Sequence, residues 1–271
     1  MKYILPFILG VGVVALVAQD VVRKPGDLGF KDTPMLPGGK WHVHDSDRPR
    51  PRQITPGAKL GDAPSDAEIL FDGKDLSKWM QYGKGADKDK IVDPQWKIVD
   101  GELVIAPGTG FLLTRAKYGD CQLHIEWAAP KDVKGTSQAR GNSGVFLMNR
   151  YELQVLDSYN DLTYADGGAG AIYGQFPPPV TPIRKTGEFN SYDIIFEAPK
   201  FENGKLVKPA YQTLLFNGVA VHWHKELLGK MTYRQVGYYE PHGDEEPISL
   251  QDHSNAVRFR NIWVRRLKLA E

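Results

Sequence analysis

The amino-acid sequence predicts an all-β fold, an antiparallel β-sandwich or jelly roll, on three observations. Short runs rich in β-branched and aromatic residues recur from about residue 67 to residue 271. Glycine, asparagine and aspartate separate these runs, and the 28 Gly and 19 Pro suit a turn-rich protein. Finally, the apolar residues show no helical periodicity sustained beyond about two turns.

The expected strands follow one another with turn residues between them. Asp100-Gly101 and Asn217-Gly218 are the strongest hairpin signals, because such pairs readily adopt the two positive φ angles of a tight hairpin turn. The run 121–127 alternates between apolar and polar residues, which is typical of a strand with one buried face. In chain order we expect strands at 68–71, 96–99, 102–105, 111–114, 121–127, 145–148, 151–157, 191–197, 211–216, 219–224 and 257–267.

The N-terminus predicts export. One early lysine and an apolar run that ends at Ala18 predict a secretory signal peptide over 1–18. The run is short for a membrane span, and an uncleaved anchor, the one expected contact with a membrane, is the alternative. The single cysteine, Cys121, excludes an intramolecular disulfide and is expected to be a buried strand thiol. We therefore expect a periplasmic or extracellular protein.

Residues 19–66 predict an extended, proline-rich arm that lies along the surface of a single β domain over 67–271. His42 and His44 would share one face of a strand and are candidates for a metal pair. The competing interpretation is an arm anchored by Trp41 with two solvated histidines, because a pair without a third ligand binds metal weakly.

Charge and motifs exclude several classes of function. A formal net charge of +1 gives no general field for nucleic acid or an anionic membrane, so neither is an expected partner. Phosphate-binding loops, dinucleotide fingerprints and the serine nucleophile elbow are missing from the sequence, so no organic cofactor is expected.

Ionisable side chains occupy polar positions of several expected strands. Glu126 shares a face with His124, Glu152 shares a face with Gln154, and Arg258 shares a face with Arg260. If these faces and His253 lined one concave sheet, they would form a polar groove suited to acid–base chemistry or to a metal held by oxygen and imidazole. The alternative is the solvent-facing side of a half-exposed sheet.

Ordered motifs give the sequence a resemblance to a known family. Among them are Phe71-Asp72-Gly73-Lys74-Asp75-Leu76-Ser77-Lys78-Trp79, His124-Ile125-Glu126-Trp127, Gly141-Asn142-Ser143-Gly144, Tyr151-Glu152-Leu153-Gln154-Val155-Leu156-Asp157, Gly170-Ala171-Ile172-Tyr173, Ile248-Ser249-Leu250-Gln251-Asp252-His253 and Val257-Arg258-Phe259-Arg260-Asn261-Ile262. Over roughly 67–269 this ordered set resembles the 3-keto-disaccharide hydrolase family, long catalogued as a domain of unknown function. The resemblance implies a concanavalin A-like jelly-roll sandwich with a sugar-facing sheet.

The resemblance also implies a reaction. A ketone at C3 of a sugar acidifies the C2 proton, so that a base removes it and the enolate expels the C1 substituent. Water then adds, or the unsaturated sugar is released. Glu126, Glu152 and His253 are the candidate base and acid.

The remaining candidates would hold the sugar or stabilise the enolate. Arg258, Arg260 or a divalent metal of unknown identity would stabilise the enolate. Asn142, Gln154 and Asp157 would orient hydroxyls, although Asp157 has the strand parity opposite to Glu152 and needs a bulge to reach the site. Tyr173 is a candidate for stacking on the sugar.

Two other functions compete with the enzyme. A non-catalytic carbohydrate-binding module would use the same sandwich with fewer ionisable groups and more exposed aromatic rings. An envelope interaction protein would use the arm for its contacts.

Overall fold

The computed structural model describes residues 28–267, so the predicted signal peptide over 1–18 lies outside the described residues. The chain divides into two compact units, one that ends at Gln53 and one that begins at Ile54. In the first unit, the His42 ring contacts the backbone carbonyl of Thr33, and short bridges pair Phe30 with Asp45 and Met35 with His42. None of the helices described for 28–267 is long and apolar enough to cross a membrane.

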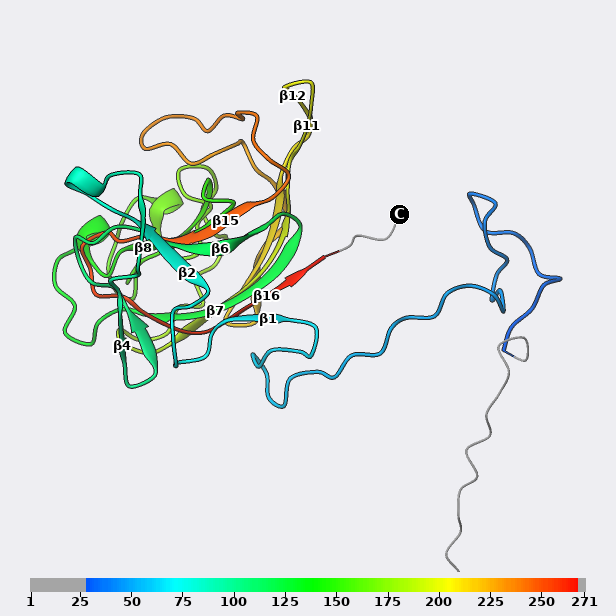
Figure 1. The fold of residues 1–271 in the computed structure, drawn as a ribbon, viewed down its shortest axis with the longest axis horizontal. Coiled ribbons are helices and arrows are strands. Elements are labelled where there is room, and N and C mark those ends of the chain that lie inside the picture. The colour runs from blue at the N-terminus through cyan, green and yellow to red at the C-terminus, as the bar shows by residue number, and fades with distance from the viewer. Residues whose placement is uncertain (1–27, 268–271) are drawn as a thin grey trace, which may run out of the picture. The chain divides into compact units, whose positions relative to one another are not determined.

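The second unit is an antiparallel β-sandwich, which confirms the predicted fold class (Figure 1). One sheet, here sheet A, has the order β14-β13-β10-β7-β16-β5-β4, with β1 also paired to β16. The other, sheet B, has the order β3-β2-β6-β15-β8-β9. The strands of sheet A are β1 (Glu68–Phe71), β4 (Lys97–Val99), β5 (Glu102–Val104), β7 (Cys121–Ala128), β10 (Asn190–Glu197), β13 (Tyr211–Phe216), β14 (Val219–Glu226) and β16 (Arg258–Arg266).

Sheet B and the connections complete the fold. The strands of sheet B are β2 (Trp79–Tyr82), β3 (Ile91–Val92), β6 (Leu112–Tyr118), β8 (Ser143–Leu147), β9 (Tyr151–Val155) and β15 (Glu246–Leu250). A separate hairpin joins β11 (Lys200–Glu202) to β12 (Lys205–Lys208), and short 3-10 turns occur at η2 (Gly85–Asp87), η3 (Ser137–Ala139) and η4 (Ala165–Gly167).

The two predicted hairpin turns form as expected. Asp100 and Gly101 have φ angles of 52° and 76° between β4 and β5, and Asn217 and Gly218 have 49° and 78° between β13 and β14. Two successive positive φ angles match the twist of antiparallel strands, and asparagine, aspartate and glycine tolerate them best.

Alternation along each strand divides the side chains between a core and two outer faces. On β7, Leu123 and Ile125 are buried in the core between the sheets, so Glu126 lies on the outer face of sheet A. On β9, Leu153 and Val155 are in the same core, so Glu152 lies on the outer face of sheet B. Cys121 is also buried in this core, as predicted.

The last part of the predicted arm, 54–66, belongs to the sandwich unit. The carbonyl of Gly61 accepts hydrogen bonds from Asn261 Nδ2 at 2.9 Å and from Trp263 Nε1 at 2.8 Å, both on β16. Asp66 forms an ion pair with Arg265 at 2.8 Å. These contacts fix the segment on the outer face of sheet A.

Candidate active site

The predicted site residues fall on both outer faces of the sandwich. A cavity of about 360 Å³ on sheet B, here the Glu152 cavity, contains Glu152, Asn142, Gln154, Tyr173 and His253. A cavity of about 880 Å³ on sheet A, here the Glu126 cavity, contains Glu126, Arg258 and Arg260. The prediction that a single concave sheet carries all these groups is therefore wrong, because β7 and β16 pair in one sheet and β9 lies in the other.

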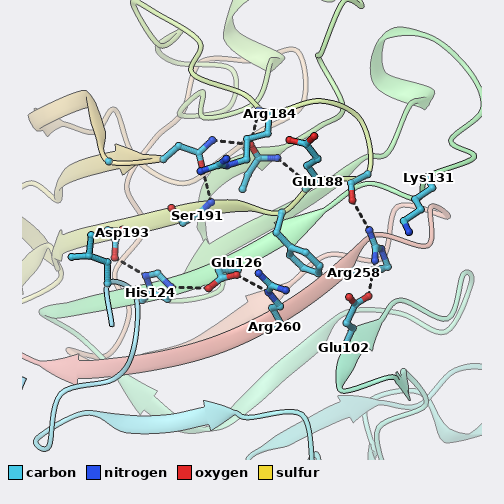
Figure 2. Close-up of a pocket in the computed structure, with 17 residues that line it drawn as sticks. Glu102, His124, Glu126, Lys131, Arg184, Glu188, Ser191, Asp193, Arg258 and Arg260 are labelled. Atoms are coloured by element: carbon cyan, nitrogen blue, oxygen red, sulfur yellow. Dashed lines mark hydrogen bonds and ion pairs between the residues drawn. The ribbon is translucent and has the colours of Figure 1, made fainter. Parts of the chain in front are cut away.

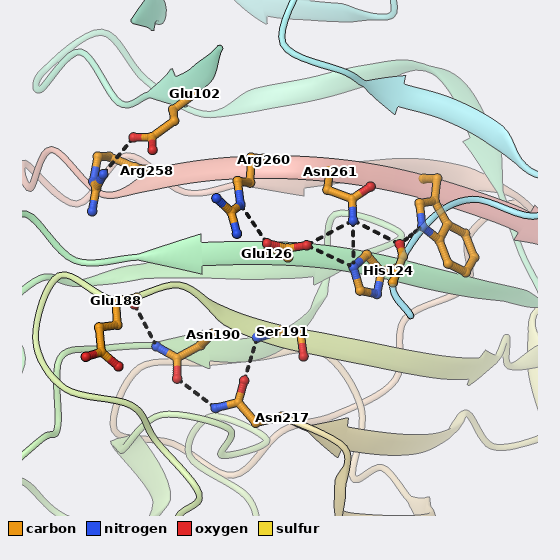
Figure 3. Close-up of polar contacts among 12 residues, drawn as sticks. Glu102, His124, Glu126, Glu188, Asn190, Ser191, Asn217, Arg258, Arg260 and Asn261 are labelled. Atoms are coloured by element: carbon orange, nitrogen blue, oxygen red, sulfur yellow. Dashed lines mark hydrogen bonds and ion pairs between the residues drawn. The ribbon is translucent and has the colours of Figure 1, made fainter. Parts of the chain in front are cut away.

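Glu126 is held by partners from β16 (Figures 2 and 3). Its carboxylate accepts hydrogen bonds from Arg260 Nε at 2.6 Å and from Asn261 Nδ2 at 2.9 Å. Burial opposes ionisation, but the His124 ring 3.8 Å away and the hydrogen bonds from Asn261 and Arg260 outweigh it and lower the pKa of Glu126 to about 2. A carboxylate this well paired is a weak base.

His124 extends the same network. Its Nδ1 donates to Asp193 at 2.6 Å, and its ring stacks on Trp263 with centroids 5.2 Å apart. Burial disfavours the charged ring, but Asp193 and Glu126 outweigh this and raise the pKa of His124 to about 9. His124 is therefore a cation at neutral pH, fixed between two carboxylates.

Both candidate arginines are also paired within the Glu126 cavity. Arg258 forms an ion pair with Glu102 at 2.7 Å and donates to the Gly187 carbonyl at 2.8 Å. Figure 2 shows Arg258 and Arg260 directed toward different carboxylates. Because the two arginines lie on sheet A, the expected enolate stabilisation by them cannot act on a sugar bound beside Glu152.

Glu152 contrasts with this network. Its carboxylate takes part in no hydrogen bond or ion pair with any residue of the described chain, and the residue is 3% exposed. Burial alone raises the pKa of Glu152 to about 8. A Cβ atom on Gly144 would lie 2.3 Å from Glu152 Oε1, so glycine leaves room for the carboxylate across the strand pair.

Amide side chains form the polar wall of the Glu152 cavity. Asn142 Nδ2 donates to the Gln138 carbonyl at 2.7 Å, and Gln154 Nε2 donates to Gln138 Oε1 at 3.1 Å. Two other amide oxygens of the lining, Gln154 Oε1 and Gln251 Oε1, are buried without a donor in the described chain. A buried acceptor without a donor costs free energy, so these oxygens are suited to accept hydrogen bonds from the hydroxyls of a ligand or from water.

The loop after β15 is fixed to the 141–144 motif. Gln251 N donates to the Gly144 carbonyl at 3.0 Å, and Ser143 Oγ donates to the Gln251 carbonyl at 2.7 Å. These bonds place the loop that carries His253 at the cavity, which explains why two motifs about 100 residues apart in the sequence contribute to one site.

Tyrosines close the cavity on another side. The hydroxyls of Tyr173 and Tyr164 are 2.5 Å apart. Burial, the Tyr164 hydroxyl and the charge of Glu152 all raise the pKa of Tyr173, so its hydroxyl stays protonated and can donate a hydrogen bond. The sequence interpretation missed Tyr164 and Tyr233, which lie on irregular loops without periodicity, and it missed Gln138 on η3.

Asp157 lines neither the Glu152 cavity nor the Glu126 cavity. It is buried, forms an ion pair with Arg140 at 3.0 Å and accepts from Thr186 Oγ1 at 2.9 Å. Alternation along the strand places Asp157 on the face opposite to Glu152, in agreement with its position outside the Glu152 cavity. No bulge turns it toward Glu152, as its position in the motif would have required.

The residues described do not offer a cluster of metal ligands. Among residues 28–267, no three His, Cys, Asp or Glu side chains lie together in an arrangement that could hold a metal ion. His42 and His44 therefore have no third ligand of these types, and the divalent metal stays a prediction on which no step below depends.

Comparisons with known proteins identify the family. The model of the 3-keto-alpha-glucoside-1,2-lyase-like domain matches residues 66–265, and the chain belongs to this family. No curated protein sequence matches the chain.

Solved structures agree with the family assignment. A crystal structure from Parabacteroides distasonis named "putative glycosyl hydrolase" is 40% identical, with a TM-score of 0.76 over 87% of this chain and 100% of that chain. A second so named from the same organism, 19% identical with a TM-score of 0.54 over 75% of this chain and 94% of that one, shares the fold. The family and the 40% identical neighbour together support an enzyme that acts on glycosides.

Proposed function

We propose that this protein cleaves 3-keto glycosides in the Glu152 cavity by removal of the C2 proton and elimination at C1. The observation that carries the proposal is the single carboxyl group of this cavity, buried and unpaired. Glycosidases that act on unoxidised sugars ordinarily use two carboxyl groups about 5 to 10 Å apart. One base accompanied by a histidine and tyrosines instead suits a substrate whose ketone already activates the C2 proton.

The proposed steps use only residues of the cavity. Ionised Glu152 takes the C2 proton, and the electrons of the C–H bond form an enolate over C2 and C3. The Tyr173 hydroxyl donates a hydrogen bond to the C3 oxygen, where the negative charge develops. When the enolate collapses to the enone, the bond between C1 and the leaving oxygen breaks, and His253 supplies the proton to that oxygen.

The outcome of the reaction depends on water. If water adds across the C1–C2 double bond, the net result is hydrolysis to a free 3-keto sugar. If the enone leaves first, the enzyme is a lyase. The unpaired oxygens of Gln154 and Gln251 would accept from the sugar hydroxyls in either case.

The decisive experiment compares 4-nitrophenyl 3-keto-glucoside with the unoxidised 4-nitrophenyl glucoside. We expect release of 4-nitrophenol from the keto substrate only, and slower release when C2 carries deuterium. Equal cleavage of both substrates would overturn the proposal. The absence of a deuterium effect at C2, under conditions where bond cleavage limits the rate, would also overturn it.

A further inference from the structure

A second cavity, of about 550 Å³, adjoins the Glu152 cavity. Tyr164, Tyr173 and Tyr233 line both cavities, so the two spaces meet at this group of tyrosines. Beyond the tyrosines, aliphatic side chains such as Leu228 and Val236 contribute to the lining. Glu152, His253 and the amides of Asn142, Gln154 and Gln251 are on the other side of the boundary, and Gln235 is the one amide among residues 28–267 that lines the second cavity.

The second cavity exposes apolar side chains to water. Leu228 is 43% exposed, Tyr233 is 68% exposed and Val236 is 77% exposed. A cluster of exposed apolar side chains beside a polar cavity is typical of a ligand-binding surface, because contact with an apolar ligand removes its area from water.

The segment that carries these residues is fixed by hydrogen bonds to its backbone. Gln175 holds it from both sides, since Leu228 N donates to Gln175 Oε1 at 2.7 Å and Gln175 Nε2 donates to the Gly229 carbonyl at 3.0 Å. Met231 N donates to the Arg150 carbonyl at 2.9 Å. The apolar wall is therefore present before a ligand binds, which lowers the entropic cost of binding.

We propose that this cavity, here the leaving-group cavity, binds an aromatic leaving group of the glycoside while the sugar lies beside Glu152. This inference rests on the proposed function and names its substrate class. The scissile bond would lie at the tyrosine boundary, with hydroxyl-binding amides on one side and apolar side chains on the other. Tyrosine rings stack on aromatic rings more favourably than on small alcohols.

Two charged residues, Asp166 and Arg234, and two neutral polar residues, Thr232 and Gln235, also line the leaving-group cavity. The opposite charges of Asp166 and Arg234 add no net charge to this side. A neutral aromatic group with one or two hydroxyls therefore matches the cavity better than a charged one.

The test compares kcat/KM for aryl and methyl 3-keto-glucosides. We expect the wild-type enzyme to prefer the aryl substrate at least tenfold, and Val236→Ser or Leu228→Ser to reduce that ratio to about twofold or less. Val207→Ser is the matched control, because Val207 is 53% exposed on β12 and lines none of the three cavities. An unchanged ratio in both cavity variants would overturn the inference.

A binding measurement separates this inference from the proposed function. Free 4-nitrophenol is titrated at about pH 6, where it is mostly uncharged, into the wild-type protein and into Val236→Ser and Leu228→Ser, with ligand NMR as the readout. Binding weakened fivefold or more by either substitution supports the leaving-group cavity even if no 3-keto glycoside is cleaved, in which case the proposed function alone fails. Cleavage without aryl preference, together with equal 4-nitrophenol binding by all variants, overturns the inference alone.

Discussion

Glu126 and Glu152 occupy equivalent positions on the two faces of the sandwich and differ in almost every property that matters for chemistry. Each lies at an outward position of a strand whose neighbouring residues are in the core. The carboxylate of Glu126 forms an ion pair with Arg260 and accepts a hydrogen bond from Asn261, and its pKa falls to about 2. Glu152 has no such partner, and its pKa rises to about 8.

The comparison shows that burial raises the pKa of both carboxyl groups and that their charged and hydrogen-bonding partners decide the final value. Desolvation raises the pKa of both carboxyls, but only Glu126 has cations close enough to reverse the effect. A face rich in ion pairs is thus suited to binding and to stability, and a buried carboxyl without partners is suited to proton transfer.

Removal of each carboxylate should separate the two faces most clearly. We expect Glu152→Gln to lower kcat/KM for a 3-keto glycoside by about 10²- to 10⁴-fold, because the amide cannot accept the C2 proton. For Glu126→Gln we expect kcat/KM to stay within about threefold of the wild-type value. Far-UV circular dichroism and thermal unfolding of both variants check the fold. A larger loss of activity in Glu126→Gln would move the active site to sheet A.

The pH dependence of kcat/KM should report the pKa of Glu152. With 4-nitrophenyl 3-keto-glucoside, whose leaving anion needs no proton from His253, activity rises with pH as Glu152 ionises and levels off above its pKa of about 8. At pH 6 we expect activity about a hundredfold below the plateau, because the rate depends on the loss of a single proton from Glu152. A carboxylate with an ordinary pKa near 4.5 would instead leave the rate flat from pH 6 to 9, and such a profile would exclude Glu152 as the base.

Stability in acid should depend on Glu126. Its pKa is lowered on folding, so its stabilising contribution is complete above the ordinary value of 4.5 and is lost as pH falls toward about 2. We expect Glu126→Gln to lower the free energy of unfolding by about 1–3 kcal/mol at pH 6, because it leaves His124 and Arg260 with one partner fewer. Urea unfolding at pH 6 and pH 3 measures the effect, and the difference between variant and wild type should shrink at pH 3.

The other half of the network has the opposite dependence on pH. The pKa of His124 is raised on folding to about 9, so its stabilising contribution is complete below 6.5 and is lost as pH rises through 9. Glu102→Gln is a suitable control for the acid experiment, because it removes the partner of Arg258 in the same cavity without touching His124. If Glu102→Gln and Glu126→Gln shift the unfolding curves identically at every pH, the coupling between Glu126 and His124 is absent.

Local sequence was sufficient to predict the fold class, the hairpin turns and the outward position of Glu126 and Glu152. These features depend on alternation and on φ angles, which short segments encode. The sheet to which each strand belongs is not local information. The partner that neutralises Glu126 is 134 residues away in the sequence, and nothing in the segment 121–127 distinguishes it from a strand that faces the sugar.

The loops of the site were the hardest part to predict. Tyr164 and Tyr233 reach the Glu152 cavity from segments without strand periodicity, and the segment that leads to Tyr233 is held by a long-range bond from Met231 N to the Arg150 carbonyl. The Gly141–Gly144 motif, in contrast, was recognisable. Gly144 leaves room for the Glu152 carboxylate, and Asn142 lines the cavity, so the motif combines small and polar residues.

The unpaired carboxyl of Glu152 also has a thermodynamic consequence for the whole sandwich. A pKa that rises from 4.5 to about 8 on folding means that the folded chain retains a proton which the unfolded chain has already lost. The contribution of Glu152 to folding is therefore most favourable below pH 4.5, and it weakens progressively as pH rises from 4.5 through 8. The ionised form required of a base is thus the less stable form of the native protein, and the core between the sheets must be stable enough to tolerate it.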